Sequence, residues 1–345
     1  MRRRSLFLRL LALTLAALLL AAGAAAVYGY RALHEPLKHD APVLSIVVAP
    51  NETPGHVIRR LEAGGHISNG KVLRAWLRLR GGMALKVGEY EVPAGTPAID
   101  VLAKLASGRT IQRAFTLVEG WSLAQVRAAL AAEQRLQQSL RGDDKALARE
   151  LGIEGSPEGW FAPDTYFFSP GVTRDRDILQ RALAEQRRRL DAAWSNRAEN
   201  LPYRSAHELL TMASIVEKET GQARERPDIA GVFVRRLQKG MRLQTDPTVI
   251  YGLGAAYKGN ITRAHLLQPT PWNTYTIDGL PPTPIAMPGR AALEAAAHPA
   301  PGTALYFVGR GDGSHQFSAT LDEHNAAVRE YQLKRRSDYR SAPTP

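Results

Sequence analysis

Hydrophobic positions follow different patterns in successive parts of the chain. Residues 10–30 form an uncharged run rich in Leu and Ala, which is long enough to span a bilayer because a spanning helix needs about 20 apolar residues. Three later segments, at 46–48, 90–92 and 115–118, read as short strands, and each precedes a short amphipathic helix. With an additional helix expected at 72–79, these repeated units predict a small α+β domain that ends near residue 120.

One helix is expected to begin after Ser205 and to end before Gly221. Ser205 and Glu208 fit a capping box, and glycine is common just past a helix end. At 100° per residue, one side of this helix carries a continuous apolar arc, made by Leu209, Leu210, Met212, Ala213 and Val216.

A single carboxylate, that of Glu217, falls inside this apolar arc. Lys218 points the opposite way, and Glu219 lies near the edge of the arc. Burial of a carboxyl group raises its pKa, because desolvation disfavours the charged form, and a raised pKa suits a general acid that works near neutral pH. Alternatively, Glu217 pairs with a buried arginine or caps a neighbouring helix, and the helix pattern alone leaves both readings open.

Two segments near the carboxyl end, 244–251 and 273–282, read as extended loops in which proline forbids helix. Their Asn, Thr, Gln and Tyr side chains offer neutral hydrogen-bonding groups and flat rings, which suit sugars; a proline-stiffened connector is the other reading. A hairpin is expected from strands at 305–308 and 315–318, and a final helix capped by Thr320 and Glu323 follows it.

The charge distribution indicates the compartment. Arg2, Arg3, Arg4 and Arg9 precede the apolar run, so the positive-inside rule places the amino end in the cytoplasm and the rest of the chain outside the membrane. A signal peptide cleaved near 22–24 is the alternative. The chain has no cysteine and a net charge of +12, but its basic residues are scattered, which argues against nucleic acid. His315 and His324 are isolated, so neither a metal site nor a cofactor is expected.

Several segments together resemble one known family. The sequences Glu-Gly-Trp-Phe-Ala-Pro-Asp-Thr-Tyr (158–166), Ala-Ser-Ile-Val-Glu-Lys-Glu-Thr (213–220), Gln-Thr-Asp-Pro-Thr-Val-Ile-Tyr-Gly (244–252) and Asn-Thr-Tyr-Thr-Ile-Asp-Gly-Leu-Pro-Pro (273–282) resemble those of endolytic murein transglycosylases of the YceG-like (MltG) type. The likeness covers essentially the whole chain. It implies an α+β fold with a cytoplasmic segment at 1–9, a transmembrane helix at 10–30, a linker at 31–42, a LysM-like domain at 43–120, a catalytic domain at 121–335 and a tail at 336–345.

The resemblance also implies an activity. This activity is the non-hydrolytic cleavage of the MurNAc–GlcNAc bond in nascent peptidoglycan, which leaves 1,6-anhydro-MurNAc ends. It would take place at the outer, periplasmic face of the inner membrane and would limit strand length. Peptidoglycan, the membrane and penicillin-binding-protein synthases are the implied partners. Glu217 matches the catalytic acid, and Glu219 and Asp246 are expected to tune or position it. The expected substrate-binding residues are Glu158, Asp164, Tyr166, Ser214, Glu219, Gln244, Thr245, Asp246, Tyr251, Asn273 and Tyr275.

Two alternatives stay open at this point. A true muramidase would need a second carboxylate to position water, whereas a lytic transglycosylase can use one carboxyl group as acid and then as base. A non-catalytic wall-binding scaffold that recruits synthases would use the anchor and the small domain equally well.

Overall fold

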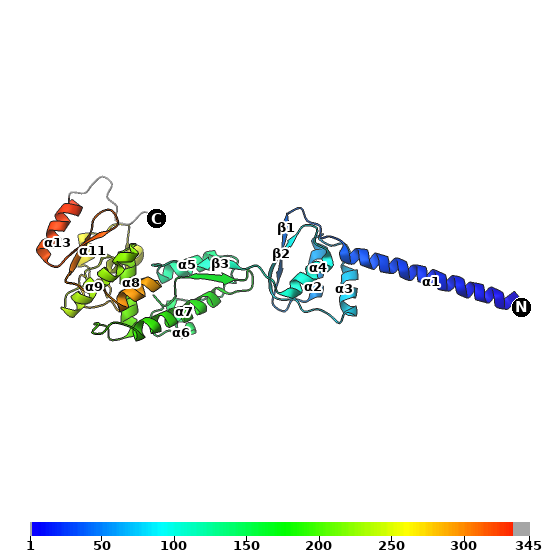
Figure 1. Ribbon diagram of the computed structural model, residues 1–345, viewed down its shortest axis with the longest axis horizontal. Coiled ribbons are helices and arrows are strands. Elements are labelled where there is room, and N and C mark those ends of the chain that lie inside the picture. The colour runs from blue at the N-terminus through cyan, green and yellow to red at the C-terminus, as the bar shows by residue number, and fades with distance from the viewer. Residues whose placement is uncertain (1, 334–345) are drawn as a thin grey trace. The chain divides into compact units, whose positions relative to one another are not determined.

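The apolar run forms part of one long helix. The computed structural model describes residues 2–333, and α1 (Arg2–His34) is its first element (Figure 1). Within α1, the stretch Phe7–His34 is long and apolar enough to cross a membrane, which is consistent with the predicted anchor. The helix continues past residue 30, so the first residues of the predicted linker are helical.

By its internal contacts the chain divides into two units. The first comprises residues up to 113 with the short segments 135–137 and 167–173, and the second comprises the remainder. The predicted domain boundaries, including the one at residue 120, stay predictions.

The first unit is a small α+β fold that contains two of the three strand–helix units predicted by the repeated pattern; the predicted strand at 115–118 and the helix after it belong to the second unit. Strands β1 (Val43–Val48) and β2 (Gly88–Pro93) are antiparallel, with Ile46 opposite Tyr90. Helices α2 (Pro54–Ala63), α3 (Gly70–Leu79) and α4 (Ala98–Ser107) accompany this ribbon. Tyr90 is fully buried among their apolar side chains, and its hydroxyl donates to the Leu105 carbonyl at 3.0 Å. Its likeness to a LysM domain stays a prediction.

Hydroxyl caps begin several helices where the sequence indicated them. Thr53 accepts from the His56 amide at the start of α2, and Ser122 forms a capping box with Gln125 at the start of α5 (Leu123–Ala132). Helix α4 differs, because Pro97 occupies its N-cap position and makes no side-chain cap. A cap of this kind typically stabilises a helix by about 1 kcal/mol.

The second unit is mostly helical. In addition to α5, its helices are α6 (Asp144–Leu151), α7 (Asp175–Ser195), α8 (Ala206–Glu219), α9 (Arg226–Gln238), α10 (Asp246–Leu253), α11 (Arg263–Leu267), α12 (Arg290–Ala297) and α13 (Leu321–Val328). Its strands are β5 (Tyr306–Gly309) and β6 (His315–Ser318), together with most of β3 (Arg113–Thr116) and the first half of β4 (Thr165–Phe168). Short 3₁₀ turns, Ala223–Glu225 and Gly254–Ala256, and a π-helical turn, Arg329–Leu333, complete the set. Strands β5 and β6 form the predicted antiparallel hairpin.

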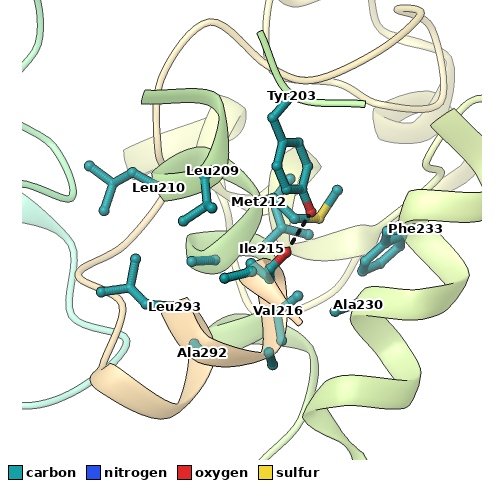
Figure 2. Packing of buried hydrophobic residues seen from close by; sticks show 14 of the residues in the cluster. Tyr203, Leu209, Leu210, Met212, Ile215, Val216, Ala230, Phe233, Ala292 and Leu293 are labelled. Carbon is teal, nitrogen blue, oxygen red and sulfur yellow. Dashed lines mark hydrogen bonds between the residues drawn. The ribbon is translucent and has the colours of Figure 1, made fainter. Parts of the chain in front are cut away.

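Helix α8 lies at the centre of this unit. All eight residues from 209 to 216 are buried, including those outside the predicted apolar arc. Figure 2 shows α8 side chains such as Met212 packed among Phe233 of α9 and Leu293 of α12. The hydroxyl of Tyr203 donates to the Ala296 carbonyl at 3.1 Å within this core. Because residues 209–216 of α8 are enclosed on every side, the helix is held firmly in the core up to the start of its last turn.

The expectation of an extended segment at 244–251 was wrong. Helix α10 begins at Asp246 and continues to Leu253, with Pro247 in its first turn. Proline is tolerated there because the first-turn N–H groups have no helical partner. The segment 273–282 is a loop without helix or strand, as expected, but residues 274–279 form turns and bends and are not extended. The predicted tail at 336–345 lies outside the described residues.

Candidate functional site

Two clefts in the second unit share the side chains of Glu219 and His315. The large cleft has a volume of about 570 Å³ and is lined also by Arg236, Gln244, Asp246 and Tyr275. The small cleft has a volume of about 250 Å³ and is lined also by Glu119, Glu217, Lys218 and Arg226. The end of α8 therefore presents the Glu219 carboxyl group to both clefts and the Glu217 carboxyl group to the small cleft alone.

Glu219 is the last residue of α8. Burial raises the pKa of its carboxyl group to about 7, and the nearby charge of Asp246 acts in the same direction. The hydroxyl of Thr245 donates a hydrogen bond to Oε1 of Glu219 and partly offsets this rise. The C-terminus of α8 carries the negative end of the helix dipole, which also disfavours the ionised form of Glu219. Glu219 thus has the protonation behaviour of a general acid.

The residues around Glu219 are fixed by their own hydrogen bonds. The Thr245 amide donates to the Thr274 hydroxyl at 3.0 Å, and the hydroxyl of Tyr275 donates to Oδ1 of Asp246 at 2.7 Å. Gln244 has a φ of 52°, a left-handed conformation that is rare for a residue other than glycine and that often marks functional sites. The structure thus brings four of the expected substrate-binding residues, Gln244, Thr245, Asp246 and Tyr275, together with Glu219.

Glu217 has a different environment. Its side chain is only 5% exposed, and Nη2 of Arg226 donates to its Oε1 at 3.0 Å. Its Oε2 accepts from the backbone N–H of Gly289, the N-cap residue of α12, at 2.9 Å. Burial raises the pKa of Glu217, whereas the Gly289 amide and Arg226 oppose that rise. Glu217 therefore links the end of α8 to the starts of α9 and α12, which are the buried-arginine and helix-capping contacts that the sequence left open as alternatives.

The sequence missed the pairing of His315 with Glu225. Nδ1 of His315 lies 2.7 Å from Oε2 of Glu225, and the His315 amide donates to the other carboxylate oxygen at 3.2 Å. Because a carboxylate only accepts, this contact places a ring proton on Nδ1. The two residues are 90 positions apart, so no local motif links them. In the described part of the chain, no group of three or more acidic or histidine side chains is arranged to hold a metal ion.

The remaining predicted site residues are not among those that line the two clefts. Glu158 is 3% exposed; its carboxylate accepts from the Leu123 amide at 2.9 Å and from the Tyr251 hydroxyl at 3.1 Å, so it caps α5. Asp164 pairs with Arg189 at 2.6 Å. The Tyr166 hydroxyl donates to the Ala162 carbonyl.

Ser214 and Asn273 have comparable contacts with the backbone. The buried Ser214 hydroxyl accepts from the Ile285 amide at 3.0 Å. The side-chain amide of Asn273 donates to the carbonyls of His265 and Leu266 in α11 and to that of Gln268, just after this helix, at 2.7 Å. Both residues shape the segments around the clefts.

A comparison with family models identifies the chain. The model of the YceG-like family matches residues 46–330, which is most of both units. The chain belongs to the YceG-like family.

Curated relatives and a solved structure agree with this assignment. The endolytic murein transglycosylase of Bacillus subtilis (strain 168) is 31% identical over 329 residues, covering 90% of this chain and 90% of the relative. The endolytic murein transglycosylase of Streptococcus pneumoniae serotype 2 is 26% identical over 308 residues, covering 79% of this chain and 55% of that protein. The crystal structure of a yceG-like protein from Listeria monocytogenes superposes with a TM-score of 0.52 at 28% identity, covering 82% of this chain and 98% of the other.

Proposed function

We propose that this YceG-like chain is a peptidoglycan lytic transglycosylase that cleaves the MurNAc–GlcNAc bond of glycan strands and leaves 1,6-anhydro-MurNAc ends. The observation that carries the proposal is the carboxyl group of Glu219, which has a pKa near 7 and lines both clefts. A group with this pKa is about half protonated at neutral pH, so it can donate a proton and later accept one.

The resemblance assigned the acid to Glu217, but the geometry favours Glu219 in that role. Glu217 is engaged by Arg226 and by the Gly289 amide, and a proton on it would weaken both contacts. Glu219 has one hydrogen-bond donor, the Thr245 hydroxyl, and that donor faces Oε1. The acid proton then resides on Oε2. Glu217 is a positioning residue in this proposal, since it fixes the last turn of α8.

The reaction uses Glu219 twice. Its Oε2–H protonates the glycosidic oxygen as the bond from that oxygen to C1 of MurNAc breaks. The C6 hydroxyl of the same MurNAc then closes on C1, and its proton returns to the Glu219 carboxylate. One C–O bond breaks and one forms, so no water is consumed and no second carboxylate is required to activate water. The charge of Asp246 favours both the protonated state of Glu219 and the positive charge that develops at C1.

The anchor and the small domain support a further part of the proposal. Helix α1 would hold the enzyme in the inner membrane with its catalytic unit on the periplasmic side, where nascent strands are made, and cleavage there would limit strand length. A LysM-like first unit would bind glycan, and penicillin-binding-protein synthases would supply the strands.

The test is the analysis of products from purified glycan strands by mass spectrometry. A lytic transglycosylase gives 1,6-anhydro-MurNAc ends without incorporation of ¹⁸O from labelled water. New reducing MurNAc ends that carry ¹⁸O would instead identify a muramidase. Intact strands bound without cleavage would favour the non-catalytic scaffold.

A further inference from the structure

Arg236 of α9 carries a buried charge that is not neutralised by any carboxylate in the described part of the chain. The residue is 7% exposed, and it makes no salt bridge with any other residue that the structure describes. Its Nε donates to the Leu305 carbonyl at 2.7 Å. Its Nη1 donates to the carbonyls of Arg242 and Leu243 at 3.1 and 2.8 Å and to the more distant Gln244 Oε1 at 3.5 Å. Within the described residues, these contacts leave Nη2 without a hydrogen-bond acceptor.

Arg236 lines the large cleft beside two other groups with unused polar capacity. Its guanidinium carbon lies 5.0 Å from the ring centre of Tyr306, and the His324 ring stacks on the same Tyr306 at 5.2 Å. Both Tyr306 and His324 line the cleft. Nδ1 of His324 is buried and has no hydrogen-bond partner among the described residues. Buried polar atoms are rarely left unpaired, so this end of the cleft is built for a polar ligand.

The charge pattern of the cleft indicates an anionic ligand group. Among the described residues, the carboxylates of the cleft are those of Glu219 and Asp246, and Asp246 already accepts from Tyr275. Burial and the Arg236 charge both lower the pKa of His324, so His324 is neutral at physiological pH. Of the lining residues that the structure describes, Arg236 is then the one that supplies positive potential in this part of the cleft. A guanidinium group that is largely buried and already held by three backbone carbonyls needs little reorganisation to bind a carboxylate.

We propose that Nη2 of Arg236 and the ring of His324 bind the free carboxylate of the lactyl substituent on C3 of a MurNAc unit that carries no peptide; where a peptide is attached, this carboxyl group is an amide and the contact is absent. This inference rests on the proposed function, because it takes the glycan strand as the ligand. GlcNAc has no acidic group. The subsite therefore distinguishes the two alternating sugars and sets the register in which a MurNAc C1, rather than a GlcNAc C1, reaches Glu219.

The hydrogen bonds that Arg236 makes within the fold do not use all of its donor atoms. The link between α9, the 242–244 segment and the start of β5 uses only Nε and Nη1. Its neighbour Arg235 also donates to carbonyls, those of Ala304 at 2.8 Å and Ala300 at 3.0 Å. Arg235 does not line the large cleft in the described structure, so it provides a matched control with the same kind of backbone contacts.

The probe is the disaccharide GlcNAc–MurNAc, which contains no MurNAc–GlcNAc bond and is not a substrate. Its binding to the full-length protein in detergent is measured calorimetrically for the free acid and for its methyl ester. We expect wild type to bind the acid about tenfold more tightly, the effect of one hydrogen bond to a charged group. Arg236→Gln should reduce this preference to less than about twofold, and Arg235→Gln should retain it.

Equal binding of acid and ester by wild type would overturn the proposal, and so would a preference that survives in a folded Arg236→Gln variant. If Arg236→Gln does not melt cooperatively, Arg236→Lys replaces it. The lysine amine cannot hold the carbonyls and reach the ligand together, so the preference should fall at least about threefold. Strand cleavage is measured separately. Cleavage by a protein that binds the acid and the ester equally would refute the subsite but not the proposed function. Tighter binding of the acid by a protein that does not cleave strands would refute the proposed function but not the subsite.

Discussion

The replacement of Glu219 by glutamine, compared with the same change at Glu217, separates the two acidic residues at the end of α8. Both substitutions keep side-chain size and remove one ionisable group. Only Glu219 lines the large cleft beside Asp246 and Tyr275, and only Glu217 is tied to Arg226 and Gly289. We expect Glu219→Gln to lose activity and Glu217→Gln to lose stability.

The size of the first effect follows from the pKa of Glu219, which is about 7. An ordinary glutamic acid, with a pKa of about 4.3, is protonated to only about 0.2% at pH 7, so burial enriches the acid form by roughly 200-fold. Glutamine supplies no proton at any pH. The turnover rate should therefore fall by about 10²–10⁴-fold, the usual contribution of general acid catalysis, while the substrate affinity changes little.

Glu217→Gln should act mainly on folding. Its amide oxygen can still accept from the Gly289 amide, but the buried guanidinium of Arg226 loses its partner at 3.0 Å. The nearest remaining carboxylate contact of Arg226 is Glu119 at 3.8 Å. A loss of about 1–3 kcal/mol in unfolding free energy is expected, with turnover within about tenfold of wild type well below the melting temperature.

The assay combines release of 1,6-anhydro-MurNAc products with thermal unfolding of each variant. Wild-type turnover should decline above pH 7, by about tenfold for each further pH unit, because the acid form of Glu219 is depleted. The reasoning is refuted if Glu219→Gln cleaves at the wild-type rate. It is also refuted if a well-folded Glu217→Gln is the inactive variant, since the acid would then be Glu217, as the family resemblance implied.

Three further predictions concern Glu219, Glu158 and α1. Thr245→Val removes a donor that lowers the Glu219 pKa, and Asp246→Asn removes a charge that raises it. The alkaline limb of the pH–rate profile should therefore move to higher pH in Thr245→Val and to lower pH in Asp246→Asn. Shifts in the same direction would contradict the assignment. Burial raises the pKa of Glu158 to about 7. The folded protein should therefore lose up to roughly 3 kcal/mol of stability as the pH rises from about 4.5 to 7. In chemical denaturation, Glu158→Gln should flatten that dependence of stability on pH. Full-length protein should sediment with membranes and retain its native amino end, and a soluble form that begins near Ala25 would indicate a cleaved signal instead.

Local patterns predicted the elements that depend on nearby residues. The hydroxyl caps at Thr53 and Ser122, the hairpin at the carboxyl end and the position of α8 all follow from signals within a few residues. The error at α10 came from reading Pro247 as a helix breaker, although proline is compatible with a first helical turn. The pairing of His315 with Glu225, and the contacts of Arg236 with Leu305, join residues far apart in the chain. Only the folded structure reveals them.

The roles of Glu217 and Glu219 could not be separated by helical periodicity, and the reason is physical. A hydrophobic arc indicates which side of a helix faces the core only when the opposite side is exposed to solvent. In α8, Thr211, Ser214 and Ile215 are as buried as Leu209 and Met212, so both sides of the helix face protein and a position inside the arc does not specify what a side chain meets. The decisive partners come from elsewhere: Arg226 and Gly289 for Glu217, and Thr245 and Asp246 for Glu219. A buried carboxyl group beside a cation is stabilised as an ion, whereas one beside another carboxylate keeps its proton. The acid is therefore selected by what the surrounding elements bring to the end of α8, and the 217/219 comparison tests that selection directly.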